Sequence, residues 1–123
     1  MMKKPLIGIA ANLSYVDMGN RGSSARNYVG TTYVKSVEMA GGVPVILPNL
    51  QDAALLERQV EMLDGVILSG GADLDPRLYG EQPIDELGFG NLEVDQLYLD
   101  LIHTCEKLGK QVLGICKGCQ AVN

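Results

Sequence analysis

The chain has 123 residues, enough for at most one domain, and its 46% hydrophobic content is sufficient for a buried core. The net charge is −5 and the ten basic residues are scattered, which excludes a nucleic-acid partner, because binding to a phosphate backbone needs a basic patch. No apolar run approaches the roughly 20 residues that span a bilayer, so we expect no membrane partner. Three cysteines without an export signal predict a cytoplasmic protein.

The first third of the chain predicts one strand and one helix. Residues 6–11 are nearly all apolar, which is typical of a central parallel strand covered on both faces. Residues 12–26 are polar and rich in glycine, so we expect a long loop at the carboxyl end of that strand. Residues 27–39 predict a helix that Gly41 and Gly42 end. Its apolar stripe has helical spacing and comprises Val29, Tyr33, Val37 and Ala40.

The middle of the chain repeats this alternation. Residues 43–47 predict a second strand, and Asp52 is placed to cap a helix over residues 53–63. Residues 65–69 predict a third strand that ends in a glycine-rich turn, and residues 74–90 are irregular. A third helix is expected over residues 92–108, with its apolar face formed by Val94, Leu97, Tyr98, Leu101, Ile102, Cys105 and Leu108.

Residues 111–115 predict a fourth strand. The resulting β-α-β-α-β-α-β pattern predicts an α/β fold, a doubly wound parallel sheet with helices on both faces, in a single domain over residues 1–123. Ligand sites of such sheets lie at the carboxyl ends of the strands. Asn12, Gly70–Gly71 and Cys116 are all expected at that edge.

Cys116 is the strongest candidate for chemistry. It lies between Gly114 and Gly118, directly after the fourth strand, where a nucleophile elbow is expected. The ordinary alternative is a buried cysteine in a turn. A nucleophile that attacks an amide carbonyl needs hydrogen-bond donors for the developing oxyanion. The candidates are the N–H of Lys117 and an N–H from Gly70 or Gly71.

Two features leave other functions open. Cys116 and Cys119 form a CxxC motif, which also occurs in thioredoxin-like redox proteins. A cysteine hydrolase needs a histidine base, but the sole histidine, His103, is expected on the polar, solvated face of the third helix. No second CxxC or histidine pair completes a metal site, and no GxGxxG indicates a dinucleotide. We therefore expect no metal and no cofactor.

Three blocks resemble the class I glutamine amidotransferase superfamily, and within it the peptidase C26 group of γ-glutamyl hydrolases. The blocks are residues 33–48 (YVKSVEMAGGVPVILP), residues 69–76 with Tyr79-Gly80-Glu81 (SGGADLDP and YGE), and residues 114–123 (GICKGCQAVN). Together they are most similar to bacterial γ-glutamyl-γ-aminobutyrate hydrolases. Arg is commoner than Lys at position 117 in the group. The group also usually has Arg where this chain has Val94, before Asp95.

The resemblance implies a flavodoxin-like three-layer domain with Cys116 as nucleophile. Backbone N–H groups of Gly71 and Lys117 would form the oxyanion hole, and Gly70, Asn12 and Gln120 would contact a small γ-glutamyl substrate. The implied reaction hydrolyses a γ-glutamyl amide through a thioester and releases glutamate and an amine. Members of the group are longer, so we expect an incomplete domain whose catalytic His and acidic partner lie beyond Asn123.

From this we predict the N-terminal half of a cysteine-dependent γ-glutamyl hydrolase that is inactive as a free chain. The exposed strand edge of half a sheet predicts a homo-oligomer. Three alternatives remain open: the glutaminase subunit of an amidotransferase with a synthetase partner, a redox protein that uses Cys116 and Cys119, and a non-catalytic partner-binding half-domain.

Overall fold

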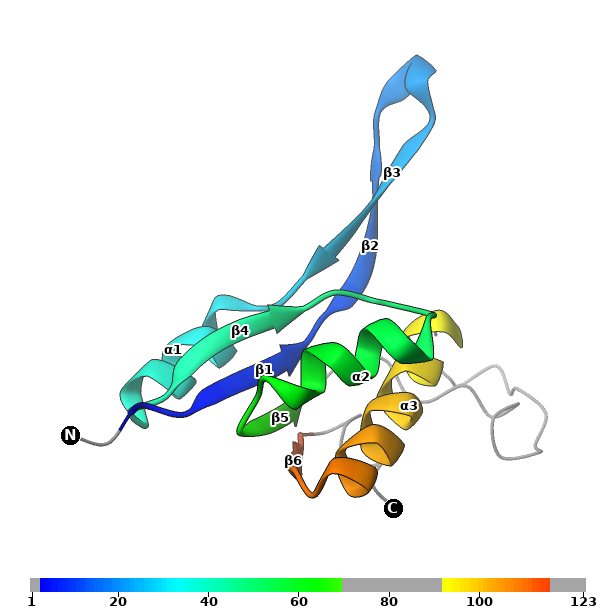
Figure 1. Ribbon diagram of the computed structural model, residues 1–123. Coiled ribbons are helices and arrows are strands. Elements are labelled where there is room, and N and C mark those ends of the chain that lie inside the picture. Colours follow the sequence, from blue (N-terminus) through cyan, green and yellow to red (C-terminus); the bar gives the residue numbers. More distant parts are fainter. Residues whose placement is uncertain (1–2, 70–91, 116–123) are drawn as a thin grey trace.

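A computed structural model of the chain describes residues 3–69 and 92–115. Four parallel strands form its main sheet in the order β4-β1-β5-β6 (Figure 1). They are β1 (Leu6–Ala10), β4 (Val43–Leu47), β5 (Gly65–Leu68) and β6 (Gln111–Gly114). The first strand is central and the chain moves outward on both sides of it. This confirms the predicted doubly wound α/β sheet.

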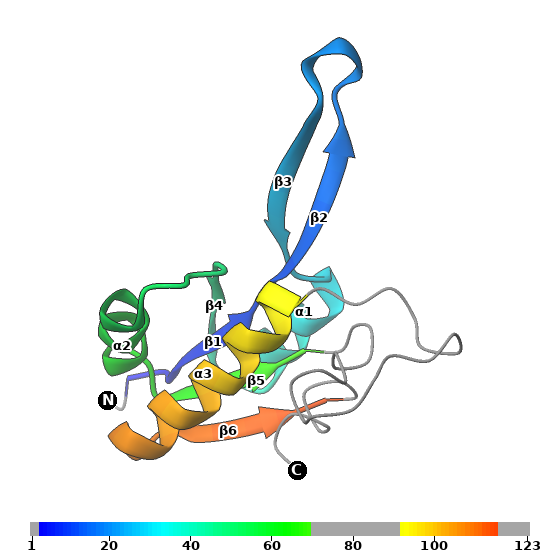
Figure 2. The ribbon, with the colours of Figure 1, turned by 90° about the vertical axis from the view of Figure 1, so that its right-hand side faces the viewer.

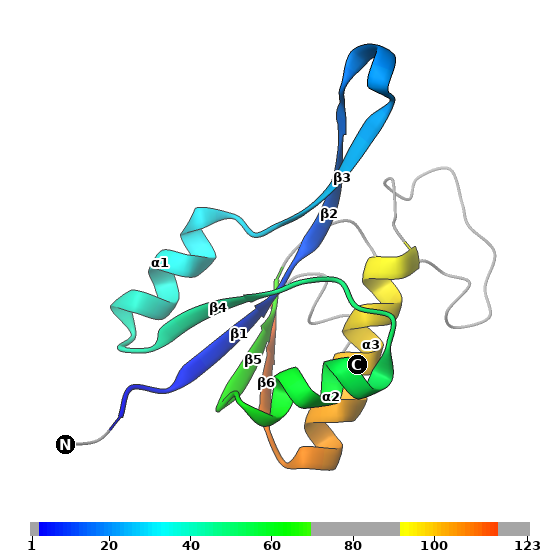
Figure 3. The same cartoon turned by 45° about the horizontal axis from the view of Figure 1, so that its top comes forward.

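Three helices cover the sheet from both sides (Figure 3). Helix α1 (Thr31–Met39) lies against one face, and α2 (Ala53–Glu61) and α3 (Leu92–Leu108) lie together against the other. The prediction of three layers is therefore confirmed, as are the bounds of α3. The Asp52 carboxylate caps α2 as expected, accepting hydrogen bonds from the backbone N–H of Ala54 at 2.9 Å and of Leu55 at 3.2 Å.

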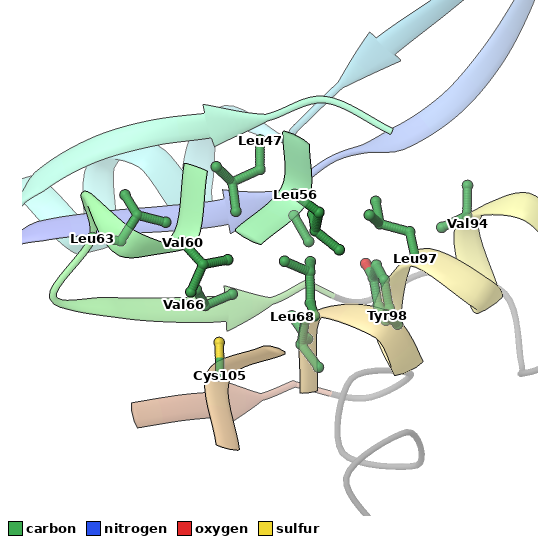
Figure 4. Packing of buried hydrophobic residues seen from close by; sticks show 12 residues of the cluster. Leu47, Leu56, Val60, Leu63, Val66, Leu68, Val94, Leu97, Tyr98 and Cys105 are labelled. Carbon is green, nitrogen blue, oxygen red and sulfur yellow. The ribbon is translucent and has the colours of Figure 1, made fainter. Parts of the chain in front are cut away.

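The core lies between the sheet and the α2–α3 layer (Figure 4). Its side chains come from alternating strand positions and from one stripe of each helix, because these are the positions that face one another across the layers. The predicted apolar face of α3 is confirmed. The buried cluster comprises Ala10, Leu47, Leu56, Val60, Leu63, Val66, Leu68, Val94, Leu97, Tyr98, Leu101 and Cys105.

The predicted loop over residues 12–26 is wrong, because these residues form a β-hairpin. Strand β2 (Asn12–Asp17) pairs antiparallel with β3 (Ser23–Tyr28), and the short 3-10 helix η1 (Gly19–Arg21) lies between them. The hairpin projects from the carboxyl end of β1, away from the main sheet (Figure 2). None of the residues of β2 and β3 is fully buried, although Leu13 packs against the edge of the core, so burial left little hydrophobic pattern in this part of the sequence.

The hairpin also shifts the start of the first helix. Residues 27 and 28 end β3, and α1 begins only at Thr31, so Val29 does not belong to the helical stripe. The predicted end is confirmed: Gly41 has a φ of +91°, and the N–H of Gly42 donates to the carbonyl of Val37 at 2.9 Å. A residue at positive φ after a helix is usually glycine.

The α1 side of the sheet is only partly covered. A groove of about 810 Å³ runs beside α1 over β5 and β6. Its lining is mostly aliphatic and includes Ile7, Val37, Ile67, Val112 and Leu113. Leu113 of β6 is 58% exposed. Within residues 3–69 and 92–115, no helix has the length and apolar character needed to cross a membrane.

Candidate active site

The candidate site is built on the carboxyl edge of the sheet, where β1, β5 and β6 end side by side. Leu68 of β5 is in register with Ala10 of β1 on one side and with Gly114 of β6 on the other. The N–H of Ile115 then donates to the carbonyl of Leu68 at 3.0 Å. The pairing of β5 with β6 therefore continues to the last residue before Cys116.

This pairing brings the ends of two described segments together. Ser69 and Ile115 are the last described residues of the two segments. The residues that follow them directly are Gly70 and Cys116. Five residues with roles predicted from the sequence lie outside the described residues: Gly70, Gly71, Cys116, Lys117 and Gln120. Their roles stay predictions.

Ser69 is the centre of a buried hydrogen-bond network at this edge. Its side chain is 1% exposed, and its Oγ lies 3.1 Å from the carbonyl oxygen of Ala10, to which it donates. The Tyr98 hydroxyl lies 3.1 Å from the same Oγ and donates to the backbone carbonyl of Ser69 at 3.0 Å. Asn12 Nδ2 makes a longer contact with Ser69 Oγ at 3.5 Å.

The network brings one predicted site residue, Asn12, to the strand that leads into the glycine turn. It also contains Tyr98 of α3, whose place on an apolar stripe predicts a packing role alone. Burial raises the pKa of the Tyr98 hydroxyl, while its hydrogen bond with Ser69 acts in the opposite direction and is the smaller effect. The hydroxyl therefore keeps its proton at neutral pH and remains able to donate.

A second polar group at the same edge was also missed. Asn49 follows β4, and its Nδ2 donates to the carbonyl of Ala11 at 3.2 Å and to Asn27 Oδ1 at 2.9 Å. The backbone N–H of Asn49 donates to the same Asn27 oxygen at 2.9 Å. These bonds connect the end of β4 to the base of the hairpin. Their signal in the sequence was the position of Asn49 after a predicted strand.

His103 and Cys105 are not at this edge of the sheet. His103 is exposed on α3, as predicted, so it is a solvated side chain. Cys105 is fully buried in the core, and this burial raises the pKa of its thiol, partly offset by the positive charge of Lys110. Among the described residues no group of three His, Cys, Asp or Glu side chains is placed to hold a metal ion.

Val94, which stands where the group that this sequence resembles usually has arginine, lies in the first turn of α3. Val94 is 1% exposed and belongs to the core cluster, and the neighbouring Asp95 is fully buried. A guanidinium at position 94 would have to leave water or find a buried partner. The valine instead extends the apolar contact between α3 and the rest of the core.

Comparison with known proteins gives a consistent set of relatives. The family model for peptidase C26 matches residues 5–123. Protein NtpR of Enterococcus hirae is 31% identical over 119 residues, which are 97% of this chain and 49% of its own length. A Mycobacterium tuberculosis protein provisionally named a glutamine amidotransferase is 32% identical over 98% of this chain and 39% of its own length. A glutamine amidotransferase-like protein of Rickettsia prowazekii is 27% identical over 100% of this chain and 44% of its own length.

The chain thus spans less than half the length of each of these three relatives. The matched part includes all four strands of the main sheet and the three helices. The family description and the names of the Mycobacterium and Rickettsia relatives support amidase- or amidotransferase-type activity for the family.

Proposed function

Because this chain belongs to the peptidase C26 family of glutamine amidotransferase-like proteins, we propose that it carries the nucleophile of a cysteine-dependent γ-glutamyl amide hydrolase. Cys116 is the nucleophile, and backbone N–H groups of Gly71 and Lys117 stabilise the oxyanion. Gly70, Asn12 and Gln120 contact the substrate. No cofactor is part of the proposal.

One observation supports this assignment above the others. The hydrogen bond from the N–H of Ile115 to the carbonyl of Leu68, 3.0 Å long, keeps β6 and β5 paired up to the residues that precede Cys116 and the glycine turn. A nucleophile and an oxyanion donor must lie about 3 Å from a common reacting atom. Neighbouring parallel strands that end together are the arrangement that permits this.

The proposed reaction proceeds in two steps. The Cys116 thiolate attacks the γ-carbonyl carbon, and the carbonyl electron pair moves onto oxygen, where the backbone donors stabilise it. The C–N bond then breaks, the amine leaves with a proton from a general acid, and a γ-glutamyl thioester remains. Water, deprotonated by the same group acting as base, attacks the thioester. Glutamate leaves and the thiol is restored.

His103 does not serve as the acid or the base of this scheme. Its side chain is exposed on α3, and α3 packs against the rest of the core through other residues. We propose that a histidine outside these 123 residues supplies the function. The isolated chain would then hydrolyse γ-glutamyl amides slowly or not at all. A version extended to the length of the relatives would be active.

The experiment is hydrolysis of γ-glutamyl-p-nitroanilide by the chain and by the extended version. Cys116→Ala abolishes turnover if Cys116 is the nucleophile. Cys119→Ser is the matched control, because it removes the second thiol of the CxxC and keeps the first. A redox role predicts a different result. Because a disulfide needs both thiols, Cys116→Ala and Cys119→Ser would abolish the redox activity to the same extent.

A glutaminase function is the second candidate, because two of the relatives are named for glutamine amidotransferases. It uses the same nucleophile on the side-chain amide of glutamine and passes ammonia to a synthetase. Glutaminase activity that rises only when a synthetase partner is added would favour it. Equal turnover of glutamine and of γ-glutamyl anilides without a partner would favour the hydrolase.

A further inference from the structure

We propose that the outer edge of β6 docks a second copy of this chain, whose own β6 pairs with it antiparallel across a two-fold axis. The interface is independent of the proposed function. β6 lies at the outer edge of the main sheet (Figure 2). Within residues 3–69 and 92–115, no strand pairs with the side of β6 that faces away from β5.

The outward backbone groups of β6 belong to Val112 and Gly114. The N–H of Ile115 donates to the carbonyl of Leu68 at 3.0 Å, so position 115 faces β5. In a strand that is paired on one side, alternate residues direct their N–H and C=O groups toward the partner, and the residues between them direct theirs away. Val112 and Gly114 therefore present hydrogen-bond donors and acceptors to the outside of the sheet.

These outward groups are complementary to those of a second copy. In an antiparallel pair, a hydrogen-bonded pair of residues exchanges both N–H···O=C bonds. If two β6 strands meet with the two-fold axis at Leu113, Val112 of each copy lies opposite Gly114 of the other. Every outward N–H and C=O of β6 then has a partner, and the same surface serves on both copies, as a two-fold interface requires.

Leu113 lies at the centre of this pairing. It lines the groove beside α1 together with Ile67, its neighbour in register on β5, and it is 58% exposed. In the two-fold register it lies opposite Leu113 of the second copy as a non-hydrogen-bonded pair, in which the Cα atoms are about 4.5 Å apart. The two side chains cover one another and close the outer side of each groove.

The charge distribution favours contact at this edge. The chain has a net charge of −5, so two copies repel one another unless they meet at a neutral surface. Residues 111–115 (QVLGI) carry no charge, and none of the described residues that line the groove is charged. Depletion of charge is typical of the core of an interface, and like charges directly opposite one another on paired strands are destabilising.

The opposite edge of the sheet is less suited to pairing. The N–H of Val43 donates to the carbonyl of Pro5 at 2.8 Å, so position 43 faces β1 and position 44 faces outward. Pro44 has no N–H to offer there, and a proline on an edge strand is one of the features that prevent pairing with another chain. We therefore assign the docking surface to β6 and not to β4.

The test is sedimentation velocity of the chain itself over about 1 to 300 μM, where we expect a monomer–dimer equilibrium. Leu113→Lys removes the leucine pair and places like charges opposite one another. The dissociation constant of the dimer should rise about 30- to 100-fold. Leu55→Lys is the matched control, because Leu55 is 55% exposed on α2, and it should change the constant by less than about twofold.

Disulfide cross-linking tests the register. In a chain with Cys116→Ser and Cys119→Ser, oxidation by copper phenanthroline should link two copies through Leu113→Cys, because a non-hydrogen-bonded pair has the Cα separation that a disulfide needs. Gln111→Cys is the control. In the proposed register Gln111 lies opposite Ile115, and the two copies of position 111 are roughly 14 Å apart, so no link should form.

Three results would overturn the interface. The first is a chain that stays monomeric over the whole concentration range. If the Val112 and Gly114 amides of that monomer also resist hydrogen exchange, another part of the chain covers the edge. The second is a dimer that Leu113→Lys and Leu55→Lys leave equally intact. The third is cross-linking through Gln111→Cys and not through Leu113→Cys. Full turnover by Cys116→Ala would refute the hydrolase and leave this interface standing.

Discussion

Two adjacent leucines on α2 offer a sharp test of the core. Leu56 is 2% exposed and lies in the cluster with side chains of β4, β5 and α3, whereas Leu55 is 55% exposed. The two substitutions Leu56→Ala and Leu55→Ala change the same atoms in the same helix. Any difference between them therefore reports burial and not helix propensity.

The expected magnitude follows from the atoms removed. Leu→Ala deletes three carbons, and burial of each contributes about 0.8 kcal/mol, so transfer alone accounts for roughly 2.4 kcal/mol. The cavity left behind adds to this, and the total for Leu56→Ala is about 3 kcal/mol. With a slope of about 2 kcal/mol/M, the urea midpoint should fall by roughly 1.5 M. Leu55→Ala should stay within about 0.5 kcal/mol of wild type.

The assay is urea unfolding followed by far-UV circular dichroism at one protein concentration. Both variants should keep the wild-type slope, since neither changes how much surface unfolding exposes. Equal losses for Leu55→Ala and Leu56→Ala would refute the placement of α2 against α3 and the sheet. The layer that supports Tyr98 would then also be in doubt.

Two further predictions concern the cap of α2 and the buried ionisable groups. Asp52→Ala removes the acceptor of the Ala54 and Leu55 N–H groups and should lower the free energy of unfolding by about 1 kcal/mol. Asp52→Asn keeps an acceptor oxygen and should retain most of that free energy. Equal losses for the two variants in urea unfolding would contradict the cap. Burial raises the folded-state pKa of Cys105 above its ordinary 9.0 and of Tyr98 above 10.0, so the unfolded chain loses these protons first. The stability they contribute is complete below those ordinary values and is lost as pH rises through the folded-state values. In urea titrations across this alkaline range Cys105→Ala should show a shallower loss than wild type, and an identical loss would contradict the burial of the thiol.

The sequence was most informative where one face of an element is buried. The bounds of β4 and α3 were predicted as the structure has them, because apolar periodicity and flanking glycines mark elements that pack against a core. The doubly wound arrangement, with helices on both faces of a parallel sheet, followed from the right-handed crossover rule. The edge at which Asn12 and Ser69 meet could be named for the same reason.

The hairpin and the Ser69 network could not be predicted in the same way. The strands of the hairpin are held by their own backbone pairing, and exposed strands such as residues 23–28 carry no apolar pattern. Tyr98 looked like one more member of an apolar stripe. Its partner Ser69 lies 29 residues earlier, and nothing in a single sequence shows which backbone carbonyl a buried hydroxyl will find.

The most direct test of the central claim is intact-mass analysis of the extended version after rapid acid quenching during turnover of γ-glutamyl-p-nitroanilide. The account predicts a γ-glutamyl adduct whose peptide maps to Cys116, absent in Cys116→Ala and present in Cys119→Ser. An adduct on another residue would contradict the assignment of Cys116 as the nucleophile. So would undiminished turnover by Cys116→Ala.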